Sequence, residues 1–136
     1  MKVTTDSCLF GAWVAAAVRS QESGDRSLLD IGAGTGLLSL MIAQKNNISI
    51  DAIEIDKDAF LQASENIAAS PWSERIKISH ADIKYFHPPA KYDIIISNPP
   101  FYENEWQSES LQRNTAHHSS ELLLTDLLEI ISNFLK

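Results

Sequence analysis

Three glycines in five residues, set between an apolar run and a helical pattern, constrain most strongly what this chain can fold into. Ser27–Ile31 has the composition of a strand, and Gly32-Ala33-Gly34-Thr35-Gly36 follows at once. Apolar residues then recur as in a helix that ends near Lys45-Asn46-Asn47. Glycines let the backbone turn sharply and let a ligand lie against bare main chain, beside the free N–H groups of the helix N-terminus. The order predicts an α/β unit with a ligand site at the carboxyl end of a parallel strand.

The rest of the chain repeats this alternation of strands and helices. Further strands are expected over residues 48–56, 76–80 and 92–97, and helices up to Arg19 and over residues 57–70 and 121–135. The first helix has N-cap candidates in Thr4-Thr5-Asp6-Ser7. Four parallel strands with crossover helices give a doubly wound, mostly parallel α/β sheet.

Acidic side chains end two of these strands. Glu54 lies 54 − 32 = 22 residues after Gly32, which matches the separation of about 20 residues for an acid that binds ribose hydroxyls. Asp56 competes for this role, and both could instead be solvated strand ends. Asp82 follows the third strand, where it could accept a hydrogen bond from an adenine amino group or could cap the turn at Ile83 and Lys84.

Asn98-Pro99-Pro100-Phe101 follows the fourth strand directly, and Tyr102 comes next. An amino group conjugated to a ring is a poor nucleophile, so an enzyme that alkylates it must draw its lone pair out of conjugation. The Asn98 side-chain oxygen and the Pro99 carbonyl could each accept one N–H of such an amine, while Phe101 stacks on the planar group. The alternative is a structural Pro-Pro loop with an aromatic ring packed on the core.

Composition favours one globular protein of the cytoplasm. The 136 residues are 44% hydrophobic, which allows a single domain over residues 1–136 with a real core. No apolar run approaches the roughly 20 residues that span a bilayer, nothing at the amino end has the order of a signal peptide, and Cys8 is the only cysteine. We therefore expect no membrane contact.

The net charge and the polar segment after Tyr102 indicate how the protein could bind a nucleic acid. A formal charge of −7 argues against extensive non-specific binding of nucleic acid but allows recognition by a few local groups. Residues 103–120 are polar and carry Arg113, His117 and His118, which with Lys2 are candidates for such contacts. The adjacent histidines lack other ligands at a spacing that would fix a metal, so no metal is expected.

Together these residues resemble a class I S-adenosylmethionine (SAM)-dependent methyltransferase. The stretch from Asp30 to Gly36 resembles the family's first motif, Glu54 its ribose-binding acid, and Asn98-Pro99-Pro100-Phe101 the motif of enzymes that methylate nitrogen. The resemblance implies SAM as the cofactor. It implies cofactor contacts from Asp30, Gly32, Gly34, Gly36, Glu54, Asp82 and Asn98, a catalytic turn of Asn98, Pro99, Pro100 and Phe101, and substrate contacts from Phe101, Tyr102, Arg113 and His117.

A narrower resemblance implies the substrate. Residues 1–6, 11–13, 66–72 and 113–118 are similar to bacterial enzymes that methylate N6 of the adenosine beside the anticodon of a valine tRNA. Alternatives within the class act on a protein glutamine or on guanine N2 of ribosomal RNA. From another class, the chain could be an NAD-binding domain or a non-catalytic cofactor-binding module, but the NAD fingerprint Gly-x-Gly-x-x-Gly differs from the Gly-x-Gly-x-Gly spacing here.

The resemblance also indicates that the chain is a fragment. Such folds normally have seven strands, whereas this sequence supplies four, so strands at the carboxyl end are expected to be missing. A sheet that stops after its fourth strand has an open edge, and we expect self-association or poor solubility from residues 1–136 alone. The sequence leaves the oligomeric state itself unknown.

Overall fold

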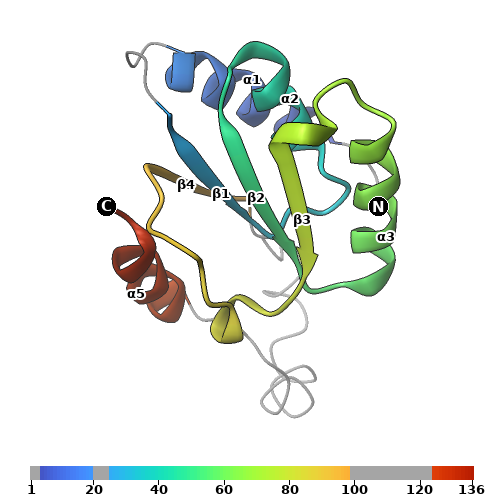
Figure 1. Ribbon diagram of the computed structural model, residues 1–136. Helices are drawn as coiled ribbons and strands as arrows, with labels where there is room; N and C mark the ends of the chain where they lie inside the picture. Colours follow the sequence, from blue (N-terminus) through green and yellow to red (C-terminus); the bar gives the residue numbers. More distant parts are fainter. Residues whose placement is uncertain (1–3, 20–24, 99–123) are drawn as a thin grey trace.

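The strand predicted before the glycine loop, β1 (Ser27–Ile31), lies inside a four-stranded sheet (Figure 1). The structure is a computed structural model that describes residues 4–19, 25–98 and 124–136. All strand pairs are parallel and the strand order is β3-β2-β1-β4, so the chain moves outward to β3 and then returns past β1 to β4. The prediction of a doubly wound parallel sheet is confirmed. The other strands are β2 (Ser49–Glu54), β3 (Ile76–His80) and β4 (Ile94–Ser97).

The helices connect and cover these strands. They are α1 (Thr5–Arg19), α2 (Leu37–Lys45), α3 (Lys57–Ala68) and α5 (Leu124–Phe134), with 3-10 turns η1 (Ser73–Arg75) and η2 (Ile83–Tyr85) on either side of β3. The predicted bounds of β1, α2 and β3 are confirmed. No helix in the described ranges has the length and apolarity that a membrane crossing requires.

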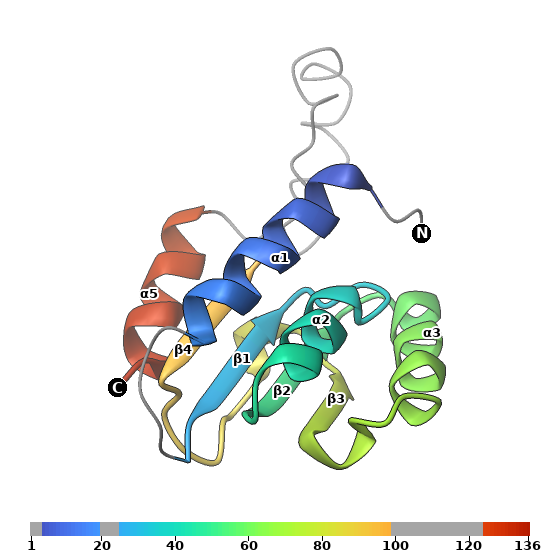
Figure 2. The same cartoon turned by 90° about the horizontal axis from the view of Figure 1, so that it is seen from above.

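Alternation along the strands divides the core into two layers, because successive strand residues point to opposite faces. Leu28 and Ile50 belong to one layer, with apolar side chains from α1, α2 and α3. Leu29 and Ile53 belong to the other, with side chains from α5 and η2. Figure 2 shows α1 and α2 side by side over the sheet, with α5 beside β4 and remote from α3. Full burial of Leu28 and Leu29 stabilises the sheet by about 1.5–3 kcal/mol each.

α1 begins with a capped first turn and packs closely against α2. Thr4 Oγ1 accepts a hydrogen bond from Ser7 N at 3.2 Å and caps the helix, one of the predicted N-cap residues. A Cβ atom at Gly11 would lie 2.6 Å from Met41 Sδ and 3.1 Å from a methyl carbon of Leu38, both on α2. The lack of a side chain at Gly11 therefore sets the distance between the two helices.

Two elements end earlier than their sequence patterns predict. β2 was expected over residues 48–56 but stops at Glu54, because Asp56 Oδ1 accepts a hydrogen bond from Ala59 N at 2.8 Å and caps α3. α3 was expected to reach residue 70 but stops at Ala68, where the Ser70 hydroxyl donates to Ile67 O at 2.7 Å. Local side-chain bonds to the backbone end both elements.

β4 begins at Ile94, two residues later than predicted, because the backbone of Tyr92 pairs with Leu135 after α5 and not with β1. Tyr92 N donates to Phe134 O at 2.8 Å and Lys136 N donates to Tyr92 O at 3.0 Å, which makes a parallel bridge with Leu135. The phenol donates to Asp51 Oδ2 at 2.6 Å, and burial together with this bond raises the pKa of Tyr92. The end of α5 is thus fixed beside the sheet.

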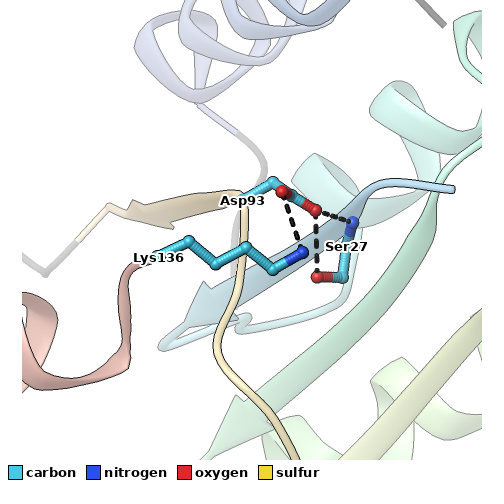
Figure 3. Close-up of polar contacts among 3 residues, drawn as sticks. All are labelled: Ser27, Asp93 and Lys136. Atoms are coloured by element: carbon cyan, nitrogen blue, oxygen red, sulfur yellow. Dashed lines mark hydrogen bonds and ion pairs between the residues drawn. The ribbon is translucent and has the colours of Figure 1, made fainter. Parts of the chain in front are cut away.

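Asp93 joins three distant segments at the amino edge of the sheet (Figure 3). Its Oδ2 atom accepts from Ser27 N at 2.9 Å and from the Ser27 hydroxyl at 3.4 Å, while Oδ1 accepts from Lys136 Nζ at 3.0 Å. The Ser27 N–H, followed by Lys136, lowers the pKa of Asp93. These bonds hold the starts of β1 and β4 to the end of the described chain, away from the carboxyl edge.

Candidate functional site

The carboxyl ends of the four parallel strands meet at one edge of the sheet. Ile31 at the end of β1 pairs with Ile53 of β2 on one side and with Ser97 of β4 on the other, and Glu54 pairs with His80 of β3. This register brings to one edge the predicted residues Asp30, Gly32, Gly34, Gly36, Glu54, Asp82 and Asn98. Ligands of open α/β sheets bind at this edge.

The glycine loop has the backbone that only glycine adopts without strain. Gly32, Gly34 and Gly36 have φ angles of 74°, 58° and 84°. A Cβ atom at Gly32 would meet nothing within 4 Å, so bare main chain there faces open space. The loop is anchored from behind, since Gly32 N and Ala33 N both donate to Ile53 O, at 2.9 and 3.0 Å. An anchored main chain with open space beside it suits close approach by a ligand.

Glu54 has a structural role that its sequence position did not reveal. The side chain is 6% exposed; Oε2 accepts from Gly34 N at 2.6 Å and Oε1 from Asp56 N at 2.9 Å. The carboxylate therefore holds the glycine loop against β2. Two oxygens provide about four acceptor positions, so acceptors remain for ligand hydroxyls. Asp56, the competing acid, is exposed and is occupied as the N-cap of α3.

Asp30 is a buried carboxyl group with one unpartnered oxygen. It is 0% exposed, Oδ2 accepts from the Ser39 hydroxyl at 2.7 Å, and Oδ1 has no partner. Desolvation raises the pKa of Asp30 to about 6, the Ser39 bond opposes that rise, and the charge of Glu54 adds to it. An uncompensated buried oxygen makes the charged form of this carboxyl group costly.

Asp82 takes the capping role that the sequence offered as one of two alternatives. Its Oδ1 atom accepts from Lys84 N at 2.9 Å and thereby caps η2. At the end of β3 beside it, His80 stacks on Phe60 with ring centroids 5.4 Å apart, and His80 Nε2 hydrogen-bonds to Ile55 O at 3.0 Å. A contact between Asp82 and an adenine stays a prediction.

Asn98 directly follows β4 and is half-buried beside α1. Its Nδ2 atom donates to Ser7 Oγ at 3.4 Å, and the preceding Ser97 hydroxyl donates to Ile31 O at 3.2 Å. The amide group is therefore held at the same edge as the glycine loop. Pro99, Pro100, Phe101, Tyr102, Arg113 and His117, together with Lys2 and His118, lie outside the described residues, so their predicted roles remain predictions.

Sequence reasoning missed two hydroxyl groups at this edge. Ser39 stands among apolar residues of α2, and a single buried serine in such a helix is a signal that could have indicated a polar partner across the core. Ser7 lies 91 residues before its partner Asn98, and no local pattern connects them. Within the residues that the structure describes, no group of three His, Cys, Asp or Glu side chains could hold a metal ion.

Comparisons with known proteins agree with this geometry. Residues 14–133 match the family model described as methyltransferase small domain. A Dyadobacter fermentans protein named tRNA1(Val) (adenine(37)-N6)-methyltransferase is 47% identical over all of this chain and 55% of its own length. A Tolumonas auensis protein of the same name is 46% identical over 99% of this chain and 55% of its own length. The chain thus spans about half the length of these curated relatives.

The fold also matches solved structures. A SAM-dependent methyltransferase from Geobacter sulfurreducens, solved with S-adenosyl-L-homocysteine, aligns with 98% of this chain and 45% of its own, with a TM-score of 0.69 and 16% identity. At this identity the match establishes a shared fold.

Proposed function

Because the chain belongs to the methyltransferase small domain family, we propose that it forms the cofactor-binding part of a SAM-dependent N-methyltransferase. The proposed substrate is the N6 amino group of an adenine in tRNA, in the anticodon loop of valine tRNA, in line with the names of the two relatives. The observation that carries the proposal is the Asn98 amide, held at the end of β4 on the same edge as the glycine loop. A cytoplasmic location follows from a tRNA substrate.

The residues at the edge fit the chemical groups of SAM. Bare main chain at Gly32 faces open space where a nucleoside can approach, and Glu54 keeps acceptor positions for ribose hydroxyls. The negative charge of the Asp30 carboxylate, whose Oδ1 atom is fully buried, suits the positive charge of the methionine portion. We assign the cofactor contacts to Asp30, Gly32, Gly34, Gly36, Glu54, Asp82 and Asn98.

Asn98 is the described residue that would act on the reacting amine. SAM would supply a methyl group from its sulfonium sulfur to the amine nitrogen, so that the S–C bond is exchanged for an N–C bond, and the surplus proton of the nitrogen would leave to solvent. The Asn98 side-chain oxygen accepts one N–H of the amine and favours a tetrahedral nitrogen as positive charge develops there. Pro99, Pro100 and Phe101 complete the proposed catalytic turn, and Phe101, Tyr102, Arg113 and His117 the proposed substrate contacts.

The length of the relatives supports a second part of the proposal. Both curated proteins are nearly twice as long as the aligned region, so we propose that residues 1–136 belong to one methyltransferase domain that further strands complete in the whole protein. Activity is accordingly proposed for the whole protein.

Radiolabelled SAM tests the proposed function. The whole protein is incubated with tRNA, with duplex DNA and with a glutamine-containing peptide, and label is expected in tRNA, with little in the other two. Hydrolysis of the labelled tRNA should release N6-methyladenosine. Label in the peptide, or in duplex DNA in preference to tRNA, would overturn the substrate while leaving the methyltransferase activity intact. Absence of label from all three substrates would favour a non-catalytic cofactor-binding module.

A further inference from the structure

A side-chain hydrogen bond joins the first turn of α1 to Asn98. Asn98 Nδ2 donates to Ser7 Oγ at 3.4 Å, across a sequence separation of 91 residues, and both side chains are half-buried. Ser7 belongs to the N-terminal turn of α1, which Thr4 caps. The contact therefore joins the start of the chain to the residue that follows β4.

A second hydroxyl lies beside Ser7 and is compatible with this direction of the hydrogen bond. Thr4 Oγ1 lies 2.9 Å from Ser7 Oγ and also accepts from Ser7 N at 3.2 Å. A hydroxyl group has one proton and two acceptor positions. When the Ser7 proton is directed to Thr4 Oγ1, both lone pairs of Ser7 Oγ are free to accept, and the Asn98 amide nitrogen supplies the proton.

We propose that Ser7, supported by Thr4, is a positioning residue that fixes the orientation of the Asn98 amide; this inference rests on the proposed N-methyltransferase function. An amide side chain is nearly symmetrical in shape, but a half-turn exchanges its acceptor oxygen for a donor nitrogen. With the nitrogen bonded to α1, the oxygen faces away from α1 and is available to accept an N–H of the target amine. The reversed amide would present N–H groups to an amine and would oppose methyl transfer.

The kinetic test uses Ser7→Ala in the whole protein. We expect kcat to fall roughly 3- to 10-fold, the range for loss of one hydrogen bond, with KM for SAM unchanged. Ser7→Thr keeps the hydroxyl and should restore most of kcat. Ser132→Ala is the matched control, since the Ser132 hydroxyl donates to Glu129 O of its own helix, and its kcat should equal that of the wild type. A normal kcat in Ser7→Ala would overturn the proposal.

A double-mutant cycle separates positioning from a general effect on structure. In an Asn98→Ala background the amide is gone, so Ser7→Ala should cause no further loss of kcat. An equal loss in both backgrounds would mean that Ser7 acts on the fold and would refute its positioning role.

A spectroscopic test decides the inference even if tRNA proves to be the wrong substrate. The side-chain NH2 signals of Asn98 are assigned in a ¹H–¹⁵N spectrum by their disappearance in Asn98→Asp. Ser7→Ala should shift these signals and speed their exchange with solvent, whereas Ser132→Ala should leave them in place. Signals that are identical in Ser7→Ala and wild type would show that Ser7 does not hold the amide nitrogen.

Discussion

Replacement of Asp30 by asparagine should change how stability depends on pH. Burial raises the pKa of Asp30 from 3.8 to about 6 in the folded chain, and the difference corresponds to about 3 kcal/mol at about 1.36 kcal/mol per pKa unit. Between these two values the folded state binds more protons than the unfolded state, so the free energy of unfolding falls as the pH rises. Above pH 6 the group is ionised in both states and the loss is complete.

Asp30→Asn removes this titration and should flatten the wild-type decline between pH 4 and 6. The difference in unfolding free energy, variant minus wild type, should therefore rise by about 2 kcal/mol from pH 4 to pH 7, the part of the total change that falls above pH 4. The absolute value at one pH is less informative, because the asparagine NH2 group lacks an acceptor at the Oδ1 position, which costs about 1–3 kcal/mol.

Urea unfolding followed by tryptophan fluorescence, to which the core-packed Trp72 contributes, measures this difference. Asp25→Asn, an exposed carboxylate in the loop before β1, serves as the control and should parallel the wild type. Parallel curves for wild type and Asp30→Asn would refute the argument, since they would mean that the Asp30 carboxyl group is solvated as in the unfolded chain.

Four further predictions follow from the site and the sheet. In calorimetry the wild type should bind SAM and not NAD, and binding of NAD alone would contradict the assignment. Gly34→Asp should abolish SAM binding, because φ is +58° at this residue and the new carboxylate would lie beside Glu54. Asn98→Ala should leave SAM affinity nearly unchanged and lower turnover by roughly two to three orders of magnitude, and near-normal turnover would make Asn98 a structural residue. Asp93→Asn should lower the free energy of unfolding at pH 7 in urea. It should also reduce the loss of this free energy that the wild type shows as the pH falls below 3.8, because folding lowers the pKa of Asp93; an unchanged pH profile would exclude a stabilising role for the Asp93 carboxylate. Residues 1–136 should self-associate in light scattering, because β4 has β1 on one side and no strand on the other within the described sheet, and a clean monomer would show that the edge is protected.

The sequence predicted the elements whose signals are local. β1 was placed to the residue, and α2 ends at Lys45 within the stretch where its end was predicted, because the glycine loop between them separates a strand pattern from a helix pattern. β4 was placed two residues early, since Tyr92 is apolar enough to continue the strand but pairs with Leu135, which is 43 residues away. A pattern read along the chain cannot reveal a partner that only the tertiary fold brings close.

The same limit applies to the site. The edge that collects Glu54 and Asn98 was predictable, because each follows a parallel strand. The bonds that each makes were not, since Glu54 holds Gly34 through a backbone N–H and Asn98 binds a helix at the other end of the sequence. Roles that depend on strand position were visible in the sequence, whereas those that depend on a long-range contact required the structure.

The strand order β3-β2-β1-β4 implies an order of assembly. β1 and β2 are joined by one short helix and so are β2 and β3, whereas Leu28 of β1 pairs with Ile94, 66 residues later. Contacts between residues far apart in sequence carry a larger loop-closure entropy and tend to form late in folding. We therefore expect β4 to join a preformed three-stranded sheet, so that Asn98 reaches its place beside α1 only in the final folding step.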